Sequence, residues 1–142
     1  MTLSGPAPWL LLVAGAHLGF QLTVALVVYP ALADVPDAGW ATAHERHSRR
    51  ITPLVAAIYL PLVAVLAWTA VAEPGAEGTW LALAGGAVAV LTTAAVAAPT
   101  HGRLATAPPA ERPELLRGLR LADQVRTAGA VVCAVGAVVL VW

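Results

Sequence analysis

Three histidines have the residue type and the spacing to hold a metal ion. His44 and His47 are three positions apart, which puts them side by side on a helix. His101 follows Pro99 near the end of a later apolar segment. Because neutral imidazole suits copper, iron and zinc, we expect His44, His47 and His101 to bind a transition metal, copper or iron, if the fold brings them together.

Residues 37–50 are expected to form a short amphipathic helix that carries two of these histidines. Trp40, His44 and His47 follow the spacing i, i+4, i+7 of one helical face, and the arginines of the segment lie off that face. The carboxylate of Asp37 can cap the first turn. The alternative is an interfacial helix, with Trp40 at the level of the lipid headgroups and the histidines in water.

His17 and Gln21 form a second candidate site, one helical turn apart. Polar groups in the middle of a membrane span are costly and usually face the bundle interior. We expect the pair to bind a cofactor, with His17 as a haem or metal ligand, or to relay protons. The alternative is a structural histidine that donates to a backbone carbonyl of a neighbouring helix. His17 precedes Pro30 by about 20 Å of helix, so we expect a cluster separate from the other histidines.

Asp123 and Arg126 are the candidate catalytic pair, three positions apart near the start of the last apolar segment. Asp123 can orient a ligating histidine, as carboxylates commonly do around metal ions. The alternative is a helix-end ion pair in which Arg126 extends towards water. Tyr29 and Tyr59 each lie close to a proline, which favours kinks and packing over catalytic phenols.

The elements that position these residues must be membrane helices. The 142 residues are 59% hydrophobic and 11% charged, whereas a soluble domain has about 25% charged residues. The formal net charge of zero argues against nucleic acid as a partner. Four apolar segments are long enough to cross a hydrocarbon core of about 30 Å as helices: residues 8–33, 51–72, 79–98 and 121–142. We therefore expect an all-α, integral membrane four-helix bundle, a single domain over residues 1–142 embedded in the lipid bilayer.

The arginines predict the orientation of this bundle. All the arginines except Arg126 lie in the first and third connections between spans, and the second connection has none. These arginines are Arg46, Arg49, Arg50, Arg103, Arg112, Arg117 and Arg120. Cytoplasmic connections are rich in basic residues. We therefore expect a multi-pass protein of the cell (inner) membrane with both termini outside the cytoplasm, and three histidines converging on the cytoplasmic end.

Small residues predict where helices pack closely. Gly15 and Gly19 bracket His17, and Gly129, Cys133 and Ala137 repeat at i+4. Such faces let helix backbones approach each other in lipid. We expect them at helix–helix contacts, within the bundle or in a homo-oligomer.

A pattern spread over nearly the whole chain is similar to that of a known family: His17, Tyr29-Pro30, Trp40-x-x-x-His44-x-x-His47, Pro99-x-His101 and Arg126 near the start of the last helix. It resembles the small four-helix membrane proteins grouped around anthrone oxygenases. In size and helix count the chain is also similar to the small membrane protoporphyrinogen oxidases. Their first-helix histidine would match His17, whereas their charged residues deep in the second helix have no counterpart here. Both resemblances imply oxidation chemistry at a membrane.

These observations predict a membrane-embedded oxidoreductase or oxygenase. We expect it to act on a small lipophilic substrate through a histidine-bound metal ion or haem. The alternative is a non-enzymatic membrane subunit, or a small solute- or metal-handling protein, in which the histidines are structural.

Overall fold

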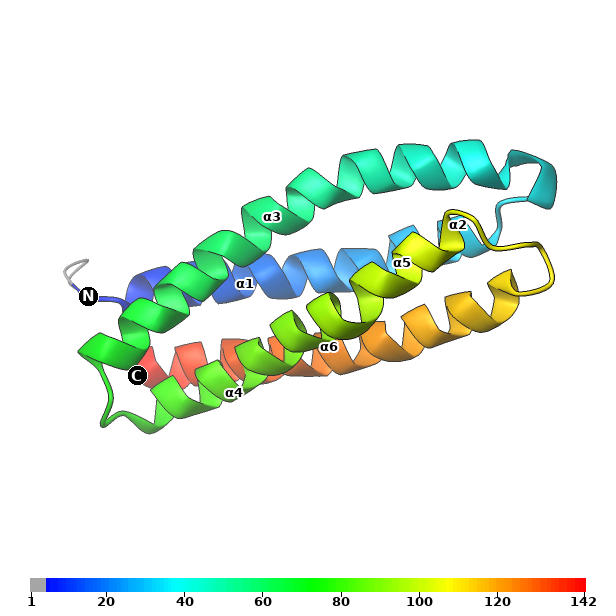
Figure 1. The fold of residues 1–142 in the computed structure, drawn as a ribbon. Helices are drawn as coiled ribbons and strands as arrows, with labels where there is room; N and C mark the ends of the chain where they lie inside the picture. Colours follow the sequence, from blue (N-terminus) through cyan, green and yellow to red (C-terminus); the bar gives the residue numbers. More distant parts are fainter. Residues whose placement is uncertain (1–4) are drawn as a thin grey trace.

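The computed structural model describes residues 5–142 and shows four long helical rods packed side by side (Figure 1). Within these residues the secondary structure is helical throughout and contains no strand. All four rods are long and apolar enough to cross a membrane; they are Ala7–Ala33, Asp37–Ala72, Glu77–Leu104 and Arg112–Val141. The expected all-α four-helix bundle is therefore confirmed.

The first and third rods each contain a π-helical turn. The first rod consists of α1 (Ala7–Thr23), a π-helical turn (Val24–Val28) and α2 (Tyr29–Ala33). The third consists of α4 (Glu77–Thr92), a π-helical turn (Thr93–Ala97) and α5 (Ala98–Leu104), so the helix continues beyond Pro99. A π-helical turn inserts one extra residue into an α-helix, which rotates all later side chains by about 100°. The two turns therefore set the directions of Tyr29 and His101.

The second rod joins the expected amphipathic helix to the second membrane span. After a 3-10 turn (Asp37–Gly39), α3 (Trp40–Ala72) continues without a break. Pro53 and Pro61 lie inside it, and a proline within a helix removes an amide donor and bends the helix. The first half of α3 bows away from the other rods (Figure 1). The fourth rod is the single helix α6 (Arg112–Val141), which begins before the fourth expected span and runs unbroken through it.

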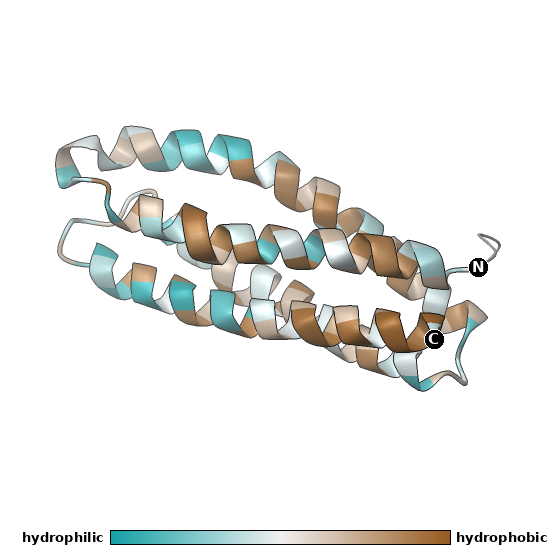
Figure 2. Cartoon of the chain, turned by 180° about the vertical axis from the view of Figure 1, so that it is seen from behind, coloured by the Kyte–Doolittle hydropathy of each residue, from teal (hydrophilic) through white to brown (hydrophobic). Residues whose placement is uncertain are grey.

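The bundle is longer than a membrane is thick. The 33 residues of α3 extend about 50 Å, against a hydrocarbon core of about 30 Å. Both ends of the described chain lie at one end of the bundle (Figure 1). Hydrophilic residues gather in the half furthest from the termini (Figure 2). The polar half is therefore the part of the bundle least suited to a hydrocarbon core.

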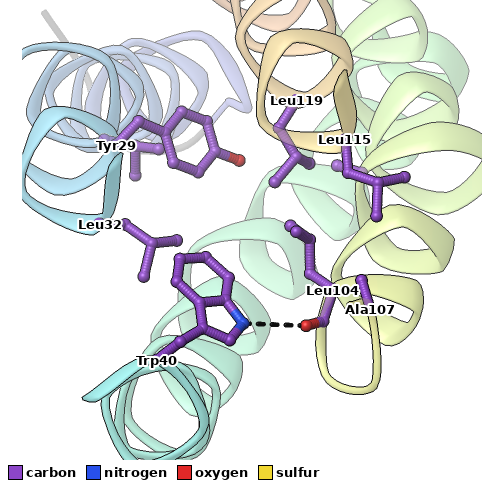
Figure 3. Close-up of a cluster of buried hydrophobic side chains, with 9 residues drawn as sticks. Tyr29, Leu32, Trp40, Leu104, Ala107, Leu115 and Leu119 are labelled. Carbon is purple, nitrogen blue, oxygen red and sulfur yellow. Dashed lines mark hydrogen bonds between the residues drawn. The ribbon is translucent and has the colours of Figure 1, made fainter. Parts of the chain in front are cut away.

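A cluster of apolar side chains closes the polar end of the bundle (Figure 3). Trp40 lies in this cluster, and its indole N–H donates to the carbonyl of Leu104 at 3.1 Å, which ties α3 to α5. The expected cap at Asp37 is wrong, because no side-chain cap is formed there. Its carboxylate instead accepts from Arg112 Nη1 at 2.8 Å, and the Arg112 guanidinium lies over the Trp40 ring.

Glycines hold α4 and α6 in close contact. A Cβ on Gly78 would lie 2.7 Å from the carbonyl oxygen of Gly136, and one on Gly129 would lie 2.7 Å from that of Gly85. The expected small-residue face on the fourth span is therefore confirmed. The corresponding expectation for Gly15 and Gly19 is wrong within the described bundle, because a Cβ at either position would meet nothing within 4 Å.

Candidate metal and ligand-binding site

A cavity of about 680 Å³ lies in the polar half of the bundle. Its walls come from α1, α3, α5 and both π-helical turns, α2 contributes Tyr29, and α6 contributes Arg126. Apolar side chains such as Phe20, Val24 and Ile51 form much of the lining, and polar groups converge from several sides. This volume lies within the range of about 300–1,000 Å³ that is typical of small-molecule pockets.

Three histidines stand together in the wall of the cavity. His44 and His47 come from α3, and His101 comes from α5. The ring centre of His101 lies 5.8 Å from that of His44 and 5.5 Å from that of His47. The His44 and His47 rings are 6.5 Å apart. The structure thus brings together the three residues that the sequence assigns to one end of the bundle.

The helical face that carries these histidines is turned into the protein. Trp40 and His44 are buried, and His47 is half-buried. The Trp40 ring stacks on the His44 ring with 5.4 Å between centres, whereas Arg46, on the opposite side, is exposed. An interfacial helix with its histidines in water does not fit this burial.

The nitrogens of the cluster are available for a ligand. Nε2 of His44 and Nε2 of His47 are buried and have no hydrogen-bond partner among residues 5–142. In a tetrahedral site, two imidazoles bound through nitrogens about 2.1 Å from the ion have ring centres about 5 Å apart. The observed rings are wider apart, and in the described part of the chain no three potential ligands are placed to close on an ion.

Arg126 brings a second polar group to the same cavity. Its Nη2 donates to Oδ1 of Asp123 at 2.7 Å and to the hydroxyl of Tyr29 at 3.0 Å. The ion pair is buried, with side-chain exposures of 6% for Arg126 and 4% for Asp123, so Arg126 does not extend towards water. Asp123 contacts Arg126 rather than orienting a histidine. Arg126 and Tyr29 line the cavity, where the guanidinium can orient an oxygen atom of a ligand.

His17 and Gln21 lie outside the cavity lining. Both are 0% exposed, and the His17 ring meets the edge of the Tyr59 ring at 4.8 Å. The alternative in which His17 donates to a backbone carbonyl does not hold, since neither ring nitrogen has a partner within residues 5–142. As the sequence predicts, this cluster is separate from the three histidines of the cavity.

Sequence reasoning missed the two tyrosines and one threonine. Tyr29 lines the cavity and accepts from Arg126, although its proline neighbour favoured a packing role. Thr93 begins the second π-helical turn, lines the cavity and pairs with Tyr59. A signal was present, because these are the sequence's two tyrosines, and a phenolic hydroxyl within a membrane span needs a partner.

Comparisons with models of known protein families, with curated proteins and with solved structures found no match to this chain.

Proposed function

We propose that the chain is a membrane-embedded oxidoreductase or oxygenase that oxidises a small lipophilic molecule at a metal ion held by His44, His47 and His101. One observation carries the proposal: the three imidazoles stand 5.5–6.5 Å apart in the wall of a cavity of about 680 Å³. Three protein ligands with an open coordination position are the arrangement of catalytic rather than structural metal sites.

The unpartnered nitrogens support a metal ion at this place. A buried polar atom without a hydrogen bond costs about 1–3 kcal/mol. His44 Nε2 and His47 Nε2 are both buried and find no hydrogen-bond partner among the described residues. One metal ion bound by His44, His47 and His101 would give both of these nitrogens a partner. Trp40, stacked on the His44 ring, would keep that imidazole facing the cavity.

The donor set favours copper or iron over haem. Haem iron accepts at most two axial ligands from the protein, so three clustered imidazoles exceed what one haem requires. Imidazole suits copper, iron and zinc, and copper and iron can change oxidation state. When bound, such an ion would supply the electron-transfer chemistry, which agrees with the resemblance to the anthrone-oxygenase-like proteins.

The remaining groups of the cavity would bind and orient the substrate. The apolar side chains Phe20, Val24 and Ile51 would hold a lipophilic body and exclude water. Arg126, fixed by Asp123 and Tyr29, would donate a hydrogen bond to an oxygen atom of the substrate. The pocket then fits a small lipophilic molecule that carries at least one oxygen acceptor.

The arginine distribution supports a location for this reaction. We place the protein in the cell (inner) membrane with both termini outside the cytoplasm, because the connections rich in arginine lie at the end of the bundle that holds the cavity. The cavity would therefore open near the cytoplasmic headgroups.

The experiment is elemental analysis and an optical spectrum of the protein purified in mild detergent. The wild type should contain copper or iron, and the variant with His44, His47 and His101 all replaced by alanine should not. Arg46→Ala is the matched control, because Arg46 lies between two of the histidines but is exposed on the other face of α3. A wild type without metal, even after incubation with copper or iron salts, would refute the proposal.

A non-enzymatic metal- or solute-handling protein is the second candidate, and the spacing of the rings favours it. The rings are wider apart than in a closed site, which suits an ion that is bound weakly and passed on. Reversible metal loading without oxidation of any lipophilic molecule would support this candidate over the first.

A further inference from the structure

His17 and Gln21 present four polar atoms that lack partners in the interior of the bundle. Both side chains are 0% exposed and lie one turn apart on α1. Both ring nitrogens of His17, and the amide nitrogen and oxygen of Gln21, have no hydrogen bond within residues 5–142. Neither side chain reaches bulk solvent, so each bond left unmade would carry its full cost.

A hydrogen-bonded pair stands between His17 and the cavity. The Tyr59 ring meets the His17 ring at 4.8 Å, and its hydroxyl lies 2.9 Å from the hydroxyl of Thr93. Thr93 donates its proton to the carbonyl of Ala89 at 2.8 Å. A hydroxyl has a single proton, so Tyr59 is the donor in its bond with Thr93. Thr93 in turn lines the cavity.

The opposite side of His17 is apolar. Towards the termini, a cluster of buried hydrophobic side chains fills the space between the helices; it contains Leu10, Ala14, Leu62, Leu66, Ala82, Cys133 and Ala137. Such a cluster stays dry. The free polar atoms of His17 and Gln21 are therefore closed off on this side, and their polar connection runs through Tyr59 and Thr93 to the cavity.

We propose that ordered water binds between His17 and Gln21 and joins Tyr59 and Thr93 in a proton-carrying branch of the cavity. A buried water typically makes about three hydrogen bonds to otherwise unsatisfied groups, which the four free atoms can provide. The proton that His17 carries comes from the cavity by the same route. To return it, the His17 imidazolium protonates this water, the water passes a proton to the Tyr59 oxygen, and Tyr59 passes its own to Thr93. Thr93 turns the proton that it had donated to Ala89 towards the cavity and releases it there, so His17 becomes neutral and the cavity regains the proton that it had supplied.

Hydroxyl-radical footprinting tests the water site directly. Radicals formed from bound water oxidise adjacent side chains, even where bulk solvent has no access. His17 and Cys133 form a matched pair, because both are 0% exposed but Cys133 lies in the apolar cluster. We expect oxidation of His17 and none of Cys133, although a thiol is intrinsically more reactive. Gln21→Leu should remove the label from His17.

Two results would overturn the water site. One is a wild type in which His17 is oxidised no more than Cys133. The other is a folded Gln21→Leu variant in which oxidation of His17 is unchanged. If Gln21→Leu does not fold, Gln21→Met, which keeps the length of the side chain, takes its place.

The proton branch rests on the proposed metal chemistry and is tested separately with Tyr59→Phe. This change keeps the ring against His17 and removes the hydroxyl that meets Thr93. The probe is reoxidation of the copper(I)-loaded protein by dioxygen, in which four copper(I) ions, one dioxygen and four protons give four copper(II) ions and two waters. We expect reoxidation to slow on the order of 100-fold, the lower end of the effect of a positioned acid, with unchanged copper content.

An unchanged reoxidation rate in Tyr59→Phe would overturn the branch. If the wild type binds no copper or iron, the proposed function fails, and the branch fails with it. Oxidation of His17 relative to Cys133 would still decide the water site, because footprinting requires no metal.

Discussion

Replacing Asp123 by alanine should destabilise the protein strongly, because it leaves a buried cation without its counter-ion. Asp123 and Arg126 are paired at 2.7 Å with side-chain exposures of 4% and 6%, so solvent screens neither charge. Removing one partner of a buried pair costs about 3–5 kcal/mol, against a total stability of about 5–15 kcal/mol for a typical domain. The hydrogen bond from Arg126 to Tyr29 would remain, but a phenol does not neutralise the charge.

Replacing Arg126 as well should restore most of the loss. A buried ion pair can often be exchanged for apolar side chains at little cost, so the double variant Asp123→Ala, Arg126→Leu should be more stable than Asp123→Ala alone. The two changes should therefore be strongly non-additive, beyond the roughly 0.3–0.5 kcal/mol expected of independent sites. Activity would be lost in the double variant, because it lacks the Arg126 side chain that is proposed to orient the substrate.

The chain contains its own control in the ion pair between Asp37 and Arg112. Arg112 Nη1 and Asp37 Oδ1 are 2.8 Å apart, but the Asp37 side chain is 71% exposed. An exposed pair contributes about 0–1 kcal/mol. The assay is reversible unfolding in mixed micelles with increasing denaturing detergent. Equal losses for Asp123→Ala and Asp37→Ala, or no rescue by Arg126→Leu, would refute the reasoning.

Three further predictions concern packing, orientation and pH. Gly85→Ala should lower the free energy of unfolding by about 1–3 kcal/mol through overpacking, because its Cβ would lie 2.5 Å from the carbonyl oxygen of Gly129. Gly15→Ala is the control and should be neutral or stabilising, because its Cβ would meet nothing within 4 Å. Equal effects of the two substitutions would contradict the α4–α6 contact. In a Cys133→Ala background, a single cysteine at Gly75 should react with an impermeant thiol reagent added to intact cells, and a single cysteine at Pro109 should not. The reverse pattern would overturn the orientation. Metal affinity, measured by equilibrium dialysis, should fall as the pH is lowered, because an imidazole must be neutral to bind an ion; affinity that does not change with pH would argue against histidine ligands.

The sequence predicts the fold and the convergence of three histidines for simple physical reasons. Apolar length fixes the number of spans, and the period of a helix puts His44 and His47 on the same face. Two spans lie between these histidines and His101 in the sequence. An even number of crossings returns the chain to the same side of the membrane, so His101 is expected on the side of His44 and His47. These inferences need local pattern and connectivity alone.

Other features depend on tertiary contacts that no local pattern reveals. Tyr29 and Arg126 are 97 positions apart, and their contact depends on the π-helical turn just before Tyr29, which has no sequence signature. The glycines show a similar limit. A small-residue face permits close approach but does not say whether a helix will use it, so Gly129 meets a neighbour and Gly15 does not.

The most direct test of the central claim is metal stoichiometry across the three single and three double alanine variants of His44, His47 and His101. If the three bind one ion, each single variant should lose most of the copper or iron of the wild type, and a second substitution should add little, because ligands that act as a unit are non-additive. Arg46→Ala should keep its metal. A wild type that holds no metal, or six variants that all retain it, would contradict the account.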